Sequence, residues 1–266
     1  MKMKRLRAWL KLIIIAMLNI QMLTSLAAKE VSVAVYDEHD KYVAVSAAYG
    51  VSWKLMELAA KSQQIVLVPQ QISWQGGMNR LRTAKVDLVF PAFKTTERET
   101  WGLFTLPLLL TGSAIFTDNN NPISELSQID FENASVGVSA DSVQECLARE
   151  VGFKHVYAIK DRAQLYSMLQ EKRIDYVFFA IAAVNYYCVH QSKLGSSNCL
   201  KQIGVPYGVK SAHAVSLNSP ESKAIIDLLN TGFLAIKDSQ EVAGLFAQYQ
   251  YSEQDLQSWR ASLNSQ

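Results

Sequence analysis

The chain is poor in cysteine, with three in 266 residues, and no two of them form a Cys-x-x-Cys pair. Its four histidines, His39, His155, His190 and His213, are scattered. Because metal sites are usually built from clustered Cys and His ligands, we expect no metal centre. The sequence also lacks a phosphate-binding glycine loop and a Gly-x-Ser-x-Gly elbow, and we expect no catalytic residue and no cofactor.

Long apolar runs are equally scarce. One run lies in residues 9–23, after a start that carries four basic residues and no acid, and before the small residues Ser25–Ala28. A basic start, a short apolar segment and an alanine-type cleavage site are typical of a secretory signal peptide. The run is short for a membrane span of about 20 residues. We expect cleavage near Ala27-Ala28 and a periplasmic protein, with an uncleaved anchor as the alternative.

The small excess of positive charge belongs to this N-terminal segment. Residues 1–27 hold five of the 26 basic side chains and none of the 24 acidic ones, so the rest of the chain has 21 basic residues and a net charge of −3. We therefore expect no nucleic-acid surface. In an oxidising compartment, Cys188 and Cys199 can form a local disulfide that leaves Cys146 unpaired, and three buried thiols are the alternative.

Apolar strands and amphipathic helices alternate along the remaining chain. Continuous apolar strands between helices are typical of parallel sheets covered on both faces, so the fold class is α/β. About 239 residues remain after the signal peptide, which suits two lobes of roughly 100–150 residues. The expected strands are residues 31–36, 64–68, 86–90, 134–138, 155–159, 174–179 and 212–216, and the expected helices are 50–62, 78–83, 142–151, 162–171, 219–236, 239–249 and 253–263.

An internal repeat supports two similar lobes. Residues 81–92 read LRTAKVDLVFPA, and residues 169–180 read LQEKRIDYVFFA. Each segment is a helix end followed by a basic residue, a β-branched residue, Asp and an apolar strand. We expect Asp87 and Asp175 to occupy equivalent turns, although convergence on a common helix-to-strand turn would give the same pattern.

Two loops at the carboxyl ends of strands are candidates for a ligand site. In the first, Thr96 and Glu99 have capping-box spacing, which predicts a helix from about Glu97. Arg98 then lies in the first turn, where a cation is unfavourable without a partner, and its guanidinium suits a carboxylate. A solvated Arg98 that pairs with a neighbouring glutamate is the alternative.

The second loop contains Asp141 and Ser142, and Ser142 has capping-box spacing to Glu145. This predicts another helix N-terminus that faces the first across a cleft. Aromatic residues lie near the same edge, Tyr36 after the first strand and Trp74 after the second, where they can wall a small pocket or belong to the core.

Together these residues resemble the bacterial extracellular solute-binding proteins of family 3, the periplasmic components of polar amino-acid ABC importers. The resemblance covers nearly all of the chain after residue 27. It rests on segments that follow the family's order, namely Gly50, Trp74, Arg80-Leu81, Lys85-Val86-Asp87, Thr95-Thr96-Glu97-Arg98, Leu106-Pro107, Val136-Gly137-Val138 and Asn230.

The resemblance implies a type II periplasmic-binding-protein fold, in which two α/β lobes with central mixed sheets are joined by a two-strand hinge. The crossover strands would lie near residues 112–117 and 204–210. Lobe 1 would comprise residues 28–112 and 208–266, and lobe 2 residues 113–207.

The resemblance also implies roles for residues at the cleft. In the family, the arginine that matches Arg98 clamps the ligand carboxylate, the residues that match Thr95 and Ser142 add hydrogen bonds, and an aromatic residue at the place of Tyr36 stacks on the ligand. We add three residues from the same edge, and the expected ligand-binding set is Arg98, Thr95, Ser142, Tyr36, Trp74, Asp141 and Phe93.

The chain departs from the family at the amino side of this site. Amino-acid binders carry an Asp that pairs with the ligand ammonium, and this chain has Ala180 there. Asp141 replaces a usual Gly, and Lys54 replaces a usual Asp. A buried ammonium without an anion costs several kcal/mol. Asp141 or Asp37 can replace the missing carboxylate, and the ligand class stays open.

The expected function is capture of a small polar, carboxylate-bearing, amino-acid-like solute between the lobes of a monomer. The solute would pass to an inner-membrane ABC permease or to a sensor. One alternative is a dehydratase-like periplasmic enzyme on the same fold, for which Glu38, His39 and Asp141 are the candidate acid–base groups. The other is a sensory or interaction module with a degenerate cleft.

Overall fold

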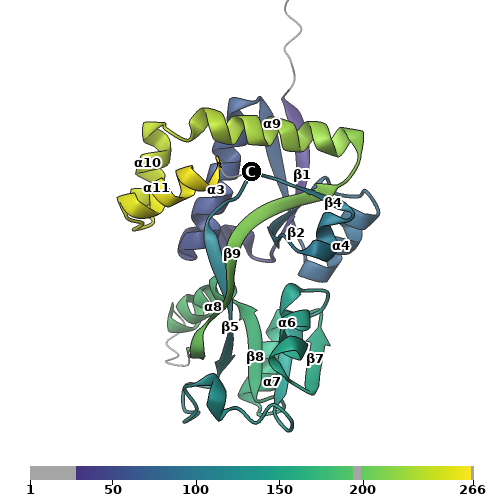
Figure 1. The fold of residues 1–266 in the computed structure, drawn as a ribbon, viewed down its shortest axis with the longest axis vertical. Coiled ribbons are helices and arrows are strands. Elements are labelled where there is room, and N and C mark those ends of the chain that lie inside the picture. Colours follow the sequence, from purple (N-terminus) through teal and green to yellow (C-terminus); the bar gives the residue numbers. More distant parts are fainter. Residues whose placement is uncertain (1–27, 194–198, 265–266) are drawn as a thin grey trace, which may run out of the picture.

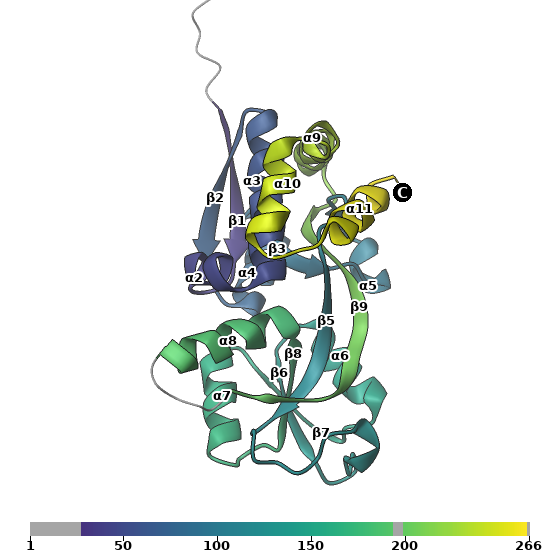
Figure 2. The same cartoon turned by 90° about the vertical axis from the view of Figure 1, so that its left-hand side faces the viewer.

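Two groups of elements, joined by a pair of long strands, make up the molecule. The computed structural model describes residues 28–193 and 199–264, so the expected signal peptide and part of the loop before Cys199 lie outside the described residues. Strands β5 (Leu110–Thr117) and β9 (Lys201–Leu217) run between the upper and lower halves (Figures 1 and 2). Within the described ranges, no helix is both long and apolar enough to cross a bilayer.

The first half is built on a parallel sheet. Strand β1 (Lys29–Val35) pairs with β2 (Ile65–Gln71) and β3 (Leu88–Phe93), and β3 pairs antiparallel with the end of β9. Its core centres on buried Leu55, Phe90 and Phe233. The other elements of this half are α2 (His39–Val45), α3 (Ala47–Ser62), α4 (Trp74–Arg82), α5 (Thr96–Glu99), β4 (Gly102–Phe104), α9 (Pro220–Ile236), α10 (Gln240–Gln248) and α11 (Glu253–Ser262).

The second half repeats this plan. Strand β6 (Ser135–Ser139) pairs in parallel with β7 (His155–Ile159) and β8 (Tyr176–Ala180), and β8 pairs antiparallel with β5. The remaining elements are the 3-10 helix η1 (Leu126–Gln128) and the helices α6 (Val143–Val151), α7 (Arg162–Gln170) and α8 (Ile181–Lys193). All strands form one continuous path in the order β2-β1-β3-β9-β5-β8-β6-β7, with β4 beside β9.

Most expected elements are present, and the two crossover segments fall within β5 and β9. The expected strand 212–216 is the end of β9 rather than a separate strand, and α4 begins four residues before the expected position. Helices α2 and α8 were not expected. Helix α8 follows β8 without a turn residue, and an apolar strand that runs directly into a largely apolar helix has no change of pattern to mark the boundary.

The repeat is confirmed in atomic detail at its two aspartates. In the first half, Asp87 Oδ2 accepts hydrogen bonds from Ser32 N at 2.7 Å and from Ser32 Oγ at 2.6 Å. In the second half, Asp175 Oδ2 accepts from Ser135 N at 2.8 Å and from Ser135 Oγ at 2.6 Å. Each serine hydroxyl also accepts from the aspartate's own N–H at 3.0 Å. Each pair therefore fastens the start of the third strand to the first strand of its sheet.

We expect Ser32→Ala to lower the free energy of unfolding by about 1–2 kcal/mol, and Ser135→Ala by about 0.5–1 kcal/mol. Each change removes one charge-assisted and one neutral hydrogen bond. The effect is larger at Ser32 because its hydrogen bonds to Asp87 are partly buried, whereas the hydrogen bonds between Ser135 and Asp175 are exposed. Urea denaturation of both variants measures the difference, and an equal or reversed order would contradict it.

The cysteine arrangement is also decided. Cys188 at the end of α8 and Cys199 form a disulfide, and Cys146 is free and exposed, so the alternative of three buried thiols is wrong.

Candidate functional site: a two-part cleft between the halves

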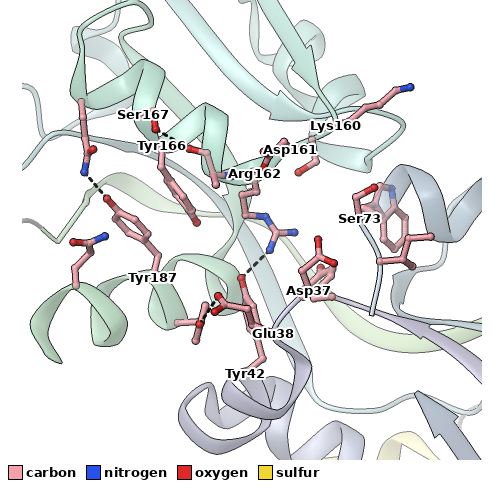
Figure 3. Close-up of a pocket in the computed structure, with 18 residues that line it drawn as sticks. Asp37, Glu38, Tyr42, Ser73, Lys160, Asp161, Arg162, Tyr166, Ser167 and Tyr187 are labelled. Carbon is pink, nitrogen blue, oxygen red and sulfur yellow. Dashed lines mark hydrogen bonds between the residues drawn. The ribbon is translucent and has the colours of Figure 1, made fainter. Parts of the chain in front are cut away.

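Two neighbouring cavities lie between the halves. The inner cavity has a volume of about 50 Å³, and its lining includes Tyr36, Trp74, Phe93 and Arg98 of the first half and Ser142 and Ala180 of the second. The outer cavity, of about 380 Å³, is lined among others by Asp37, Tyr42 and Ser73 of the first half and Lys160, Tyr166 and Tyr187 of the second (Figure 3). Both linings include Tyr36, Trp74, Ser139 and Arg162, so the cavities meet at these side chains.

Arg98 lies in the inner cavity with only 5% of its surface exposed. Its Nη1 donates to the carbonyl oxygen of Phe93 at 3.0 Å, and its Nη2 donates to the carbonyl oxygen of Asp141 at 3.4 Å. Burial lowers the pKa of Arg98 from its usual value, but a guanidinium stays cationic at neutral pH. Among the described residues, no carboxylate is close enough to form an ion pair with it. The buried positive charge is therefore stabilised by carbonyl dipoles and not by an ion pair.

Trp74 completes the wall around Arg98. The guanidinium carbon lies 5.1 Å from the centre of the indole ring, a cation–π geometry. The indole Nε1 donates to the same carbonyl oxygen of Asp141, at 3.0 Å. Arg98 and Trp74 of the first half thus both donate hydrogen bonds to one backbone carbonyl of the second half. This carbonyl is therefore a direct contact between the two halves, made by two residues that line the inner cavity.

Asp141 contributes through its backbone. Its φ of 60° is in the left-handed region, which glycine adopts most readily. The turn aims its carbonyl at Arg98 and Trp74, while the residue itself is exposed and absent from the linings of both cavities. The side-chain role expected of Asp141 as a substitute anion therefore has no geometric support at the inner cavity.

The caps of the two short loops differ from the capping boxes expected at Thr96 and Ser142. Thr95, not Thr96, precedes α5, and its Oγ1 accepts from Arg98 N at 3.2 Å. The helix thus begins one residue earlier than expected, so Glu99 is not at the N3 position of a capping box, and it forms an ion pair with Lys94 at 2.9 Å. Thr95 is thus committed to the helix and does not line either cavity.

Ser142 precedes α6, but its hydroxyl makes no capping bond. Glu145 accepts instead from Asp141 N at 3.1 Å, one residue earlier than the expected box. Ser142 Oγ is buried without a hydrogen-bond partner and lines the inner cavity. A buried hydroxyl without a partner is unfavourable, so this oxygen is available to a ligand.

Ala180, where the resemblance implies an Asp in amino-acid binders, lines the inner cavity. Ala180 ends β8 there, and the neighbouring wall is formed by Ala182 and Ala183 of α8. Among the described residues that line the inner cavity, none is a carboxylic acid, and the two that are charged at neutral pH, Arg98 and Arg162, are basic. The electrostatic environment of the inner cavity favours an anion.

Arg162 is a residue of both cavities that the sequence analysis missed. It begins α7, its Nη1 donates to Tyr42 Oη across the cleft at 2.8 Å, and its guanidinium carbon lies 4.5 Å from the centre of the Tyr36 ring. Tyr36 was expected to stack on a ligand, and here one face carries Arg162 while the ring also stacks with Tyr49 at 5.5 Å. The argument applied to Arg98, a cation in the first turn of a helix, applies equally to Arg162 and would have found it.

The acidic residues of the outer cavity are in part already engaged. Glu38 accepts from Tyr186 Oη at 2.6 Å and pairs with Lys41. Asp161 Oδ1 caps α7 by accepting from Ala163 N at 2.8 Å. Asp37 lines the cavity on the side of the first half and makes no ion pair with a described residue (Figure 3).

Most of the chain matches the model of a known protein family. The family model of the bacterial extracellular solute-binding proteins, family 3, matches residues 31–252. A search of curated proteins gave no match.

Solved structures with the same type II periplasmic-binding-protein fold include relatives of several kinds. An arginine transport periplasmic binding protein from Legionella pneumophila has a TM-score of 0.65 at 15% identity, covering 83% of this chain and 99% of its own. A histidine kinase sensor domain has a TM-score of 0.68 at 15% identity, covering 84% and 97%. The ligand-binding core of GluR0 from Nostoc punctiforme, in complex with L-glutamate, has a TM-score of 0.63 at 21% identity, covering 84% and 100%.

The family match covers both halves, both crossing strands and the cleft between them, and the expected resemblance and fold class are confirmed. This chain belongs to the bacterial extracellular solute-binding proteins of family 3.

Proposed function

We propose that this protein captures a small carboxylate-bearing solute in the cleft between its halves. The observation that carries the proposal is Arg98, a buried guanidinium that faces a cavity and has no carboxylate partner among the described residues. A buried cation is stabilised when an anion pairs with it, and the fork of a guanidinium matches a carboxylate with two parallel hydrogen bonds. Ser142 Oγ, buried and unpaired in the same cavity, adds a further hydrogen bond.

The two halves act as lobes that close over the solute. We assign residues 28–112 and 208–266 to lobe 1 and residues 113–207 to lobe 2, with β5 and β9 as the hinge. Contacts between the lobes, from Trp74 and Arg98 to the Asp141 carbonyl and from Arg162 to Tyr42, stabilise the closed form. With these contacts made, the inner cavity of about 50 Å³ is too small for an entire amino acid, so the solute enters when the lobes open.

The solute is amino-acid-like in size, and the captured form serves import or sensing. We favour delivery by a monomeric periplasmic protein to an inner-membrane ABC permease, since relatives named as transport proteins share the fold. The fold also occurs in a histidine kinase sensor domain, which makes sensing the alternative. Tyr36, Trp74 and Phe93 supply the apolar wall for the body of the solute.

A thermal-shift screen tests the proposal. We expect at least one small carboxylate to raise the melting temperature by about 5–10 °C at 100 times its Kd, since that occupancy adds about 2.7 kcal/mol to the stability of a chain of this size. The matched amide of the same carboxylate should give little or no shift.

The screen includes amines and neutral sugars as controls. Shifts with those compounds and none with any carboxylate would contradict the proposal. Chemical turnover of a compound that shifts the melting temperature would instead support an enzyme.

A further inference from the structure

A second group of unsatisfied donors lies beside the outer cavity. Arg162 and Tyr166 are four residues apart on α7, so they share one face of that helix. Arg162 Nε and Tyr166 Oη are both buried without a hydrogen-bond partner, although both side chains line the outer cavity. Tyr166 is 92% buried, since its exposed fraction is 8%. Figure 3 shows both side chains on the same side of the cavity.

The rings around Arg162 do not neutralise its charge. Its guanidinium contacts the faces of Tyr36 and Phe179 and donates to Tyr42 Oη. Burial raises the pKa of Tyr36, Tyr42 and Tyr166, so all three phenols are neutral at physiological pH. Among the described carboxylates, none forms an ion pair with Arg162. Its positive charge therefore remains uncompensated next to empty space.

The charges that surround the junction of the two cavities sum to a positive value. Glu38 is paired with Lys41, and Asp161, which caps α7, has Lys160 beside it in the chain. With Lys41 included, these charges are four cations, Arg98, Lys160, Arg162 and Lys41, and three acids, Asp37, Glu38 and Asp161. This excess of one cation favours a solute of net negative charge.

The two arginines also lie within reach of one solute. Arg98 lines the inner cavity, and Arg162 lines both cavities, with Tyr36 and Trp74 as their shared walls. The outer cavity, at about 380 Å³, has the size of a small-molecule site, whereas the inner cavity holds little more than one polar group. A solute with one acid group at Arg98 would thus place its other end at Arg162.

We propose that the solute is a short dicarboxylate whose second acid group is bound by Arg162 and Tyr166. This inference rests on the proposed function and names the substrate class. The second carboxylate accepts from Arg162 Nε and from Tyr166 Oη, which gives both buried donors a partner. Asp37 lines the same cavity and accommodates an amino group, so the class includes dicarboxylates with and without an amine.

The test compares acids with amides of the same shape by isothermal titration calorimetry. The probes are glutarate and its monoamide, and glutamate and glutamine. We expect each diacid to bind at least about tenfold more tightly than its amide. The amide has no charge, and its NH2 group cannot accept a hydrogen bond, whereas both oxygens of a carboxylate can. Equal affinities within both pairs would overturn the inference.

A matched pair of variants assigns the effect to the two donors. Tyr166→Phe removes only the unpaired hydroxyl, and we expect it to weaken glutarate about tenfold while the monoamide changes less than about twofold. Tyr176→Phe is the control, because Tyr176 is also a buried tyrosine of the second half and lines neither cavity. Equal effects of the two variants on glutarate would show that Tyr166 has no special role and would overturn the inference.

The variant Arg162→Ala distinguishes this inference from two others. One is that Arg162 occupies the place of a cationic ligand, and the other is the proposed function itself. We expect the variant to abolish the preference for acids over amides. A gain of affinity for arginine in that variant would show that Arg162 occupies the place of a cationic ligand, and the inference would be wrong. If amides and acids bind equally well but depend on Arg98, the proposed function holds and this inference fails. If none of the four probes binds, this inference fails, and the thermal-shift screen of other carboxylates decides the proposed function.

Discussion

Arg98→Ala is expected to weaken binding of a carboxylate solute by at least about 100-fold while the protein stays folded. A guanidinium that binds a carboxylate in a buried site makes two charge-assisted hydrogen bonds, and their loss amounts to about 3 kcal/mol or more. The fold should tolerate the change, because Arg98 gives up only two hydrogen bonds to backbone carbonyls and a contact with Trp74. Calorimetric titration measures the affinity, and circular dichroism measures the fold.

Two controls make this experiment specific. Arg82→Ala removes a guanidinium that is exposed, stacks on Trp101 at 5.6 Å and is absent from the linings of both cavities, so affinity should be unchanged. Arg98→Lys keeps the charge and loses the fork, so binding should be weakened but retained in part. Full affinity in Arg98→Ala would show that the solute binds elsewhere or carries no carboxylate.

Gly232→Ala is expected to lower the free energy of unfolding by about 3 kcal/mol, although Gly-to-Ala changes in helices usually stabilise by up to about 1 kcal/mol. Gly232 lies in α9 where this helix crosses α3. A Cβ atom there would sit 2.3 Å from the carbonyl oxygen of Ala59 and 2.8 Å from its carbonyl carbon. Both atoms are backbone, so the helices must move apart, and the contacts of Leu229 and Phe233 with the core loosen.

Gly244→Ala is the matched control. Gly244 also lies within a helix, α10, but a Cβ atom there would meet nothing within 4 Å. We expect this change to stabilise the protein by about 0.5–1 kcal/mol. Guanidinium denaturation of both variants gives the two values, and the same sign in both would contradict the packing argument.

The order of the elements was accessible from the sequence because it depends on local patterns. The apolar runs before Tyr36 and after Ile174 are strands, and the stripe in residues 50–62 is a helix, as their periodicity predicted. The two similar sequence segments also showed that Asp87 and Asp175 hold equivalent positions. Their common role as acceptors for Ser32 and Ser135 required coordinates, since those serines lie 55 and 40 residues away in the chain.

The candidate site was only partly accessible. Arg98, Tyr36, Trp74, Phe93 and Ser142 could be placed at one edge of the sheets from their positions at strand ends, and all five line the inner cavity. The assignments of Thr95 and Asp141 depended on side-chain direction, which spacing does not determine. Helix α8 and the tyrosines that it brings to the outer cavity were missed because no turn residue marks its start.

The sequence by itself determined the succession of strands and helices, the family and the presence of an arginine at the start of α5, because these depend on periodicity and on residues that are neighbours in the chain. Only the tertiary structure decided which charges face one another. It placed Arg98 and Arg162, 64 residues apart in the chain, on the linings of adjoining cavities, and it left no acidic side chain among the described residues of the inner one. The physical reason is that the electrostatic environment of a cleft depends on distances through space between residues of the two halves, which are far apart in the chain.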